Sequence, residues 1–159
     1  MRSVHVALAV REHDPGAVFD RVRHFAGYPE LVPVVRSVTV HEVSAEEETS
    51  DWEVYFRNGI LSWTEEDRFD RAALTILFSQ LDGDFESFTG SWRVSREGAG
   101  CRVDFDAEFD FGIPSLAGIL DPVAVKVFKE TIARIVSGLF TGASVIGDEA
   151  VAEALAGSL

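Results

Sequence analysis

The sequence predicts one α+β domain, in which a curved, antiparallel, seven-stranded sheet wraps around a single long helix near the C-terminus. Residues 101–111 alternate strictly between apolar and charged side chains, as in an antiparallel strand with one buried and one solvated face. Asn58-Gly59 lies between two further alternating runs, which indicates a tight hairpin. Residues 121–140 carry an apolar stripe at helical spacing. Since a sheet and a helix that are each apolar on one side must cover each other, the core lies between them.

Short helices are expected between the first two strands. Asp14 followed by Pro15 predicts a helix start, because Asp caps free backbone N–H groups and Pro is favoured in the first turn. Gly27 predicts the end of this helix, and Tyr28-Pro29 blocks its continuation. The other elements expected here are a strand over residues 4–10, a short irregular helix over residues 30–34, a strand over residues 37–44 and an acidic loop at Glu46, Glu47 and Glu48.

The hairpin at Asn58-Gly59 determines how its two strands are expected to pair. The pairs predicted by a two-residue turn are Arg57 with Ile60, Phe56 with Leu61, Val54 with Trp63 and Trp52 with Glu65. Side chains alternate between the two faces of a strand, so one face of the hairpin is predicted to be buried. The members of that face are Trp52, Val54, Phe56, Leu61, Trp63, Glu65, Asp67 and Phe69. Two carboxyl groups therefore lie at the end of an otherwise apolar face.

Three more strands and the long helix complete the expected fold. Strands over residues 73–81, 85–96 and 101–111 each direct one set of side chains toward the helix. The expected inward set is Ile76, Phe78, Gln80, Phe88, Gly90, Trp92, Val94, Cys101, Val103, Phe105, Ala107, Phe109 and Phe111. Asp121-Pro122 predicts the start of the long helix by the same signal as the first helix.

Composition and charge exclude several classes of function. The net charge is −13, and a chain this acidic disfavours nucleic-acid phosphates and anionic membrane surfaces as partners. No apolar run reaches the ~18 residues that would span a membrane. Cys101 is the only cysteine, so neither a disulfide nor a Cys-rich zinc site is expected, and the 4 histidines show no metal-ligand spacing. The sequence therefore predicts a cytoplasmic protein with no membrane insertion, no metal and no cofactor.

The chain length of 159 residues corresponds to one domain, since domains usually have roughly 100 to 200 residues. We expect a ligand-binding domain over residues 1–142 and an Ala-rich tail over residues 143–159 that either forms a short helix or frays. Whether two copies associate as a homodimer is left open by the sequence.

Four stretches of the chain share their pattern with a known superfamily. They are the aromatic-Pro segment of residues 28–33, Trp63 with the charged residues after it, the Gly-x-Phe to Trp stretch of residues 83–92, and residues 105–111 with Pro114, Leu116, Leu120 and Phe128. On these residues the chain resembles the START-like superfamily (the SRPBCC, Bet v 1-like or helix-grip fold), and within it the polyketide cyclase and coenzyme Q-binding START-like group. The resemblance covers residues 3–140 and implies a deep, mostly apolar pocket for a lipid, quinone or polyketide.

The chain departs from the aromatase/cyclase branch of that group at its polar residues. Asp67 stands where the branch has an inward Arg, and Ala107 stands where it has a Gln. Val34 and Val35 replace polar residues after the aromatic-Pro segment. A cyclase with this sequence would have to use other groups, whereas the coenzyme Q-binding branch implies a carrier without an assigned reaction.

Glu65 and Asp67 are the candidate catalytic residues. Two carboxyl groups in an apolar pocket hold protons more tightly, so that one can act as acid or base near neutral pH. The alternative is that the strand end emerges into water and both groups are solvated. Gln80 and Thr131 are expected either to hydrogen-bond a ligand or to bond to nearby backbone. The candidate ligand-binding residues, for which the alternative is simple core packing, are Trp52, Phe56, Trp63, Phe78, Gln80, Phe88, Trp92, Phe105, Phe109 and Thr131.

Three functions are consistent with these residues. The first is a polyketide cyclase/aromatase of secondary metabolism such as antibiotic biosynthesis, which binds a hydrophobic, aromatic polyketide-type molecule and promotes its cyclisation or dehydration. The second is a non-catalytic binder or carrier of a quinone, lipid or hydrophobic metabolite, including a self-resistance binder. The third is a protein-interaction module that uses the acidic sheet face and the Ala-rich tail.

Overall fold

A computed structural model describes residues 1–56, 59–111 and 117–157, with the backbone alone for residues 117–122. In chain order the elements are β1 (Arg2–Val10), α1 (Pro15–Val22), the 3-10 helix η1 (Phe25–Gly27), α2 (Tyr28–Leu31), β2 (Val35–Glu42), β3 (Glu47–Phe56), β4 (Gly59–Asp70), β5 (Thr75–Gly83), β6 (Ser87–Glu97), β7 (Gly100–Asp110), α3 (Ala117–Leu139), β8 (Ser144–Val145) and α4 (Glu149–Gly157). The predicted α+β class is confirmed. An eighth strand, β8, joins the seven that were expected.

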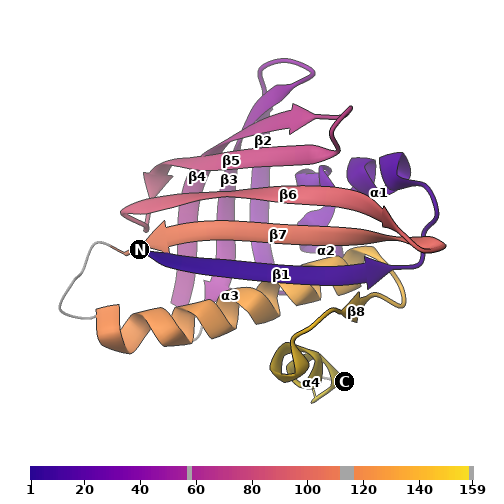
Figure 1. Ribbon diagram of the computed structural model, residues 1–159. Coiled ribbons are helices and arrows are strands. Elements are labelled where there is room, and N and C mark those ends of the chain that lie inside the picture. The colour runs from indigo at the N-terminus through magenta and orange to yellow at the C-terminus, as the bar shows by residue number, and fades with distance from the viewer. Residues whose placement is uncertain (57–58, 112–116, 158–159) are drawn as a thin grey trace.

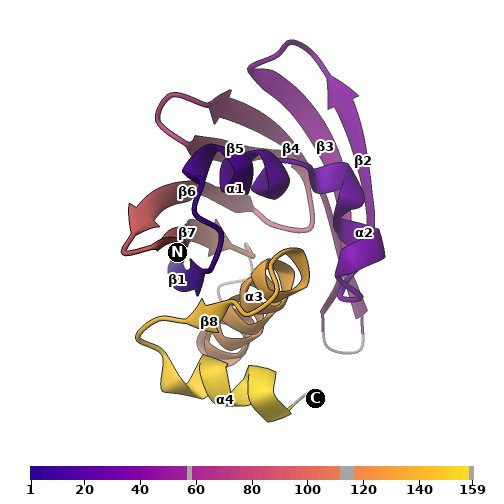
Figure 2. The ribbon, with the colours of Figure 1, turned by 90° about the vertical axis from the view of Figure 1, so that its right-hand side faces the viewer.

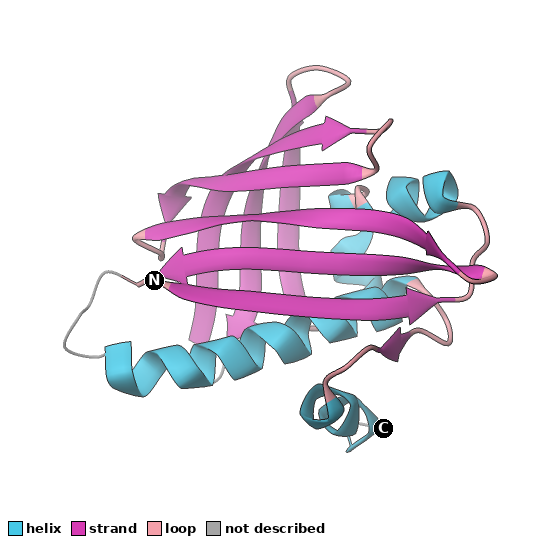
Figure 3. Cartoon of the chain, in the orientation of Figure 1, coloured by secondary structure: helices cyan, strands magenta, loops and turns pink. Residues whose placement is uncertain are grey.

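The strands form one antiparallel sheet in the order β2-β3-β4-β5-β6-β7-β1-β8. Figure 1 shows α3 running the length of the sheet, and in Figure 2 the sheet curves around this helix. In Figure 3 the strands form one continuous layer, with α3 running below it in that view. The apolar faces of the sheet and of α3 meet in one core, as the sequence predicted.

The hairpin of β3 and β4 has the predicted buried face but not the predicted register. Trp52 pairs with Trp63, whereas the sequence predicted that it would pair with Glu65. The register is shifted by two positions, and because side chains repeat every second residue along a strand, this shift leaves the same residues buried. Arg57 and Asn58, on which the predicted turn rests, lie outside the described residues.

The boundaries of the helices before β2 differ from the predicted ones. The start of α1 is confirmed, since the Asp14 carboxylate accepts a hydrogen bond of 3.0 Å from the Gly16 N–H. The helix ends at Val22 rather than at Gly27. Tyr28-Pro29 begins α2 instead of blocking a helix, because Pro fits the first turn, where backbone N–H groups need no intrahelical acceptor.

The long helix α3 begins earlier than predicted. It starts at Ala117, before the Asp121-Pro122 pair. Ala117 and Leu120 are strong helix formers, so the helix extends past the Asp-Pro pair toward the N-terminus. Pro114 and Leu116, which contribute to the superfamily resemblance, lie outside the described residues.

The C-terminal tail folds against the rest of the chain. In β8, Ser144 and Val145 pair with Ala9 and Leu8 of β1 and so cover part of the sheet edge. The helix α4 follows, so of the two alternatives that the sequence left open the tail forms a short helix. The Asp148 carboxylate accepts a hydrogen bond of 3.2 Å from the N–H of Val151, which is buried. The division into residues 1–142 and 143–159 stays a prediction. None of the described helices is long and apolar enough to cross a membrane.

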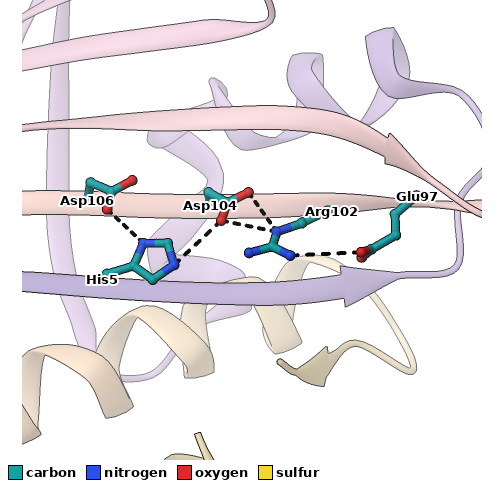
Figure 4. Close-up of polar contacts among 5 residues, drawn as sticks. All are labelled: His5, Glu97, Arg102, Asp104 and Asp106. Carbon is teal, nitrogen blue, oxygen red and sulfur yellow. Dashed lines mark hydrogen bonds and ion pairs between the residues drawn. The ribbon is translucent and has the colours of Figure 1, made fainter. Parts of the chain in front are cut away.

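The acidic outer face of β7 is cross-linked to β1 by a short row of polar contacts (Figure 4). His5 Nδ1 lies 2.7 Å from Asp106 Oδ1, and Arg102 Nε lies 3.0 Å from Asp104 Oδ2. Arg102 also approaches Glu97 at 3.8 Å. The contacts of His5 join β7 to β1, and that of Glu97 joins β7 to β6. Solvent-exposed pairs of this kind contribute only about 0–1 kcal/mol each, so the row adds little stability.

Candidate ligand cavity and carboxyl pair

The space between the sheet and α3 is almost completely filled by side chains. The remaining cavity has a volume of about 50 Å³. Its lining consists of Trp52, Val54, Trp63, Glu65, Phe78, Phe88, Trp92, Phe105, Phe128, Thr131, Ile132 and Ile135. A cavity of this size has room for about one or two water molecules, whereas small-molecule sites usually have roughly 300–1,000 Å³. A ligand as large as a polyketide therefore requires these side chains to move apart.

A larger hollow lies on the outside of the molecule but has the wrong chemistry for an apolar ligand. It is a groove of about 680 Å³ where the outer faces of β6, β7 and β1 approach β8 and α3. Asp106, Glu108 and the ion pair between Lys129 and Asp148 (3.2 Å) contribute to its walls. Since apolar ligands gain affinity from burial against apolar walls, the interior cavity is the better candidate site.

Phe128 of α3 fills the centre of one end of the interior. Its ring centroid lies 5.0 Å from Phe109, 5.7 Å from Phe85, and 6.0 Å from both Phe88 and Phe56. Phe85 and Phe88 are themselves stacked at 4.6 Å. Ring pairs at these separations attract one another by about 0.5–1.5 kcal/mol beyond the burial of their surface. These five residues are called the aromatic cluster below, and two of them, Phe88 and Phe128, line the cavity.

Seven of the predicted ligand-binding residues line the cavity. They are Trp52, Trp63, Phe78, Phe88, Trp92, Phe105 and Thr131. Phe56 and Phe109 contact Phe128 instead of the cavity. Val54, Phe128, Ile132 and Ile135 also line the cavity but were not predicted as ligand-binding residues. The last three belong to the apolar stripe of the long helix and were detectable by their spacing.

Gln80 has the backbone-capping role that the sequence left open as the alternative to ligand binding. Its Nε2 donates to the Phe85 carbonyl at 2.9 Å, and its Oε1 accepts from the Phe85 N–H at 3.3 Å. Gln80 is absent from the lining of the cavity. The side chain therefore holds the turn between β5 and β6, and with it the ring of Phe85, in place.

Glu65 and Asp67 are buried, so the alternative of a solvated strand end is wrong. Glu65 is 4% exposed, lines the cavity, and accepts a hydrogen bond of 2.7 Å at Oε1 from the indole N–H of Trp63. Asp67 is completely buried and accepts a hydrogen bond of 2.5 Å at Oδ2 from the Ser50 hydroxyl. The Ser50 oxygen in turn accepts from the indole N–H of Trp52 at 2.8 Å. Two tryptophans and one serine thus position the carboxyl pair.

The surroundings of the pair favour one proton held between the two carboxyl groups. Burial raises the pKa of Glu65 well above its ordinary value, and the hydrogen bond to the Asp67 carboxyl and the charge of Asp67 raise it further. Burial also raises the pKa of Asp67, but the hydrogen bonds from Glu65 and Ser50 oppose that change. Since the same hydrogen bond favours the protonated form of Glu65 and the ionised form of Asp67, Glu65 carries the proton and Asp67 accepts it. One group of the pair can donate a proton while the other receives one.

Tyr28 adds an apolar wall behind this pair and no free hydroxyl. Its side chain is fully buried, and the hydroxyl donates to the Val22 carbonyl at 2.5 Å. Burial raises the pKa of Tyr28 well above its ordinary value, and the charges of Glu65 and Asp67 act in the same direction. The phenol therefore stays protonated and bound to backbone.

Glu48 is a third buried carboxyl group, which was not predicted as a site residue. It belongs to β3 rather than to the predicted acidic loop, is 7% exposed, and pairs in register with Asp67. Burial raises its pKa to about 7, the charge of Asp67 adds to this effect, and Arg23 opposes it. Its burial was detectable from the alternation of side chains along the strand, since Glu48 lies two and four residues before the inward Ser50 and Trp52. Glu65, Asp67 and Glu48 are called the carboxyl row below.

The carboxyl row predicts that stability falls as pH rises above about 4.5. The unfolded chain ionises these groups near pH 4, whereas in the folded protein the pKa of Glu48 is raised to about 7 and the pKa of Glu65 is raised well above its ordinary value. Within that pH window, the free energy of unfolding falls by about 1.4 kcal/mol per pH unit for each proton that only the folded protein retains. Urea unfolding at pH 5 and pH 7.5 measures the slope.

Glu65→Gln is expected to flatten this dependence, because the variant has one buried group fewer to ionise. Glu66→Gln is the matched control, since Glu66 lies on the same strand but points outward toward Arg68 at 2.8 Å. Equal slopes for Glu65→Gln and the unmodified protein would contradict the assignment of a retained proton to Glu65.

Comparisons with known proteins agree on one family and one fold. A family model described as polyketide cyclase/dehydrase and lipid transport matches residues 12–136. No curated protein sequence matches the chain. Among solved structures, the protein TTHA0849 from Thermus thermophilus has a TM-score of 0.80 and 24% identity, covering 87% of this chain and 94% of that one. The Zhui aromatase/cyclase from Streptomyces sp. R1128 has a TM-score of 0.65 and 18% identity, covering 86% and 87% of the two chains. A START superfamily protein from Mycobacterium smegmatis has a TM-score of 0.66 and 17% identity, covering 96% and 98%.

Proposed function

Because the chain belongs to the polyketide cyclase/dehydrase and lipid transport family, we propose that it binds a hydrophobic, aromatic polyketide-type molecule between the sheet and α3 and promotes its cyclisation or dehydration. The observation that carries this proposal is the buried, proton-sharing pair of Glu65 and Asp67 at the wall of an aromatic cavity. The chain shares the START-like helix-grip fold with its solved neighbours. The fold alone does not fix the reaction, so the proposal depends on the pair.

The chemistry assigned to the pair is the transfer of one proton in each direction. In an aldol cyclisation, the ionised carboxylate takes a proton from the carbon next to a ketone, the resulting enolate attacks a second carbonyl carbon, and the protonated carboxyl donates its proton to the new alkoxide. In the dehydration that follows, a second α-proton goes to one carboxylate while the other carboxyl protonates the departing hydroxyl. General acid–base catalysis of this kind contributes about 10²–10⁴-fold in rate.

The aromatic walls make a second contribution to catalysis by orienting the substrate. Trp52 and Trp63 lie parallel, with an interplanar angle of 2° and centroids 5.8 Å apart, and Phe78 stacks on Phe105 at 5.6 Å. Flat walls hold a flexible chain of ketones in a folded, near-planar arrangement, which brings the reacting carbons together. Proximity of this kind can lower a barrier by several kcal/mol, about 7–11 in favourable cases.

The test is product formation from a poly-β-ketone thioester surrogate, followed by liquid chromatography and mass spectrometry. The protein is expected to change the product pattern toward one cyclised, dehydrated product, compared with the mixture formed spontaneously. An unchanged pattern, together with tight binding of the surrogate, would contradict the catalytic proposal.

Such a result would favour a second candidate function, a carrier of a quinone, lipid or other hydrophobic metabolite. A specific observation supports it, because apart from the tryptophans Glu65 and Thr131 are the only polar side chains among the described residues that line the cavity. Native mass spectrometry of freshly purified protein, followed by denaturing extraction, would identify a co-purified ligand.

A further inference from the structure

The carboxyl row continues from the interior cavity to the surface of the protein. Glu65 lines the cavity, Asp67 is the next inward residue along β4, and Glu48 lies opposite Asp67 on β3. Glu48 also lines a surface pocket of about 510 Å³, together with Arg23 and Glu42. Three carboxyl groups therefore connect a closed cavity with a pocket that is open to solvent.

Asp67, the middle member of the row, has one buried oxygen atom with no N–H or hydroxyl donor among the described residues. Its Oδ2 accepts from Ser50, but its Oδ1 is buried and no N–H or hydroxyl of the described residues donates to it. Leaving a buried acceptor of this kind without a hydrogen bond destabilises the folded protein. The available donors are the protonated forms of its neighbours in the row, since Glu65 hydrogen-bonds to Asp67 and Glu48 lies opposite it.

The surroundings of Glu48 suit a group that exchanges protons with water. Arg23 at the end of α1 favours its ionised form, and this guanidinium is held 3.9 Å above the ring of Phe69. Asp67 on β4 and Glu42 on β2 face Glu48 and favour its protonated form. The result is a pKa of about 7, at which both forms of Glu48 are populated near neutral pH.

We propose that Asp67 and Glu48 form the path by which Glu65 exchanges its proton with solvent while the cavity is closed. In each inward step, water protonates Glu48, a proton passes from Glu48 to Asp67, and another passes from Asp67 to Glu65, so that the total charge changes only by the proton taken up. The use of this path in a reaction rests on the proposed function, because acid–base chemistry in a closed cavity requires a way to restore the proton of the pair. Glu48 does not line the cavity and is a positioning residue in this scheme.

The test follows the protonated carboxyl band of Glu65 by infrared spectroscopy after rapid mixing of the protein with D₂O. The band is identified as the one that disappears in Glu65→Gln. Glu48→Gln is expected to slow its shift from the COOH to the COOD frequency by at least tenfold, because the amide cannot pass on a proton. Glu48→Asp retains a carboxyl group and is expected to restore fast exchange.

Glu47→Gln is the matched control, because it makes the same change one residue away on an outward side chain that contacts Arg68 at 3.4 Å. It is expected to leave the exchange rate unchanged. Equal exchange rates in Glu48→Gln and the unmodified protein would overturn the path and assign exchange to opening of the cavity. Product formation from the thioester surrogate is measured separately, so that slow exchange in Glu48→Gln without any catalysis would refute the reaction and leave the path standing.

A measurement on the unmodified protein covers the case in which Glu48→Gln fails to fold. Carboxyl ¹³C chemical shifts followed against pH should show Glu48 titrating in two steps, one of them shared with the Glu65–Asp67 pair, as coupled groups do. A single Glu48 step that is independent of the pair would also overturn the proposal.

Discussion

The double variant Glu65→Gln with Asp67→Asn is expected to lose catalysis of cyclisation by about 10²–10⁴-fold and to keep its affinity for the substrate surrogate. The amides preserve the size of both side chains and remain able to accept from Trp63 and Ser50, which donate to the native carboxyls at 2.7 and 2.5 Å. Neither amide acts as an acid or a base near neutral pH, so both catalytic functions are lost together. Product analysis gives the rate, and calorimetric titration with the surrogate gives the dissociation constant.

Glu66→Gln is the control for this loss, because it removes one negative charge from the same strand on the opposite face. It is expected to retain at least half of the original rate. A double variant with an unchanged rate would exclude the pair from proton transfer and leave only orientation by the aromatic walls as a source of catalysis.

Phe128→Ala is expected to open the interior, because this one ring occupies the centre of the aromatic cluster. The variant should lose about 3–5 kcal/mol of stability in urea unfolding, the usual cost of deleting a buried Phe ring. It should also bind naphthalene, an apolar probe, at least tenfold more tightly than the unmodified protein in calorimetric titration. Apolar cavities left by such deletions stay dry and accept small aromatic molecules.

Phe140→Ala is the matched control for Phe128→Ala, because Phe140 is also buried (1% exposed, against 7% for Phe128) but packs outside the cavity against Arg21. It should lose similar stability without gaining affinity for naphthalene. Phe128→Leu is a milder variant that shortens the side chain and serves if the alanine variant does not fold. Wild-type affinity for naphthalene in a folded Phe128 variant would show that other side chains keep the interior closed.

Most of the fold could be predicted because the sheet alternates cleanly. The inward residues of β6 and β7 follow from parity alone, and the predicted buried face of the β3–β4 hairpin is confirmed despite the wrong register. Faces depend on a repeat of two residues, which an error of two positions does not disturb. Helix boundaries were less predictable, since Tyr28-Pro29 is compatible both with stopping one helix and with starting the next.

The candidate site was predictable only in part. Local pattern placed Glu65 and Asp67 on the buried face, but it treated Glu48 as a member of an acidic loop because three consecutive glutamates usually indicate solvent. Only the strand pairing shows that Glu48 lies opposite Asp67. The size of the cavity was also unpredictable, because side chains that fill a core and side chains that line a pocket have the same composition. In the structure, the side chains between the sheet and α3 leave a cavity of only about 50 Å³.

All 3 tryptophans of the protein, Trp52, Trp63 and Trp92, line this cavity. The intrinsic tryptophan fluorescence of the protein therefore comes entirely from the walls of the proposed binding site, and its emission maximum and intensity report directly on what occupies the interior. Trp63 adds a second sensitivity, because its indole N–H donates to Glu65 and its quantum yield should change when that carboxyl loses its proton. Binding and protonation can thus be followed in the unlabelled, unmodified protein.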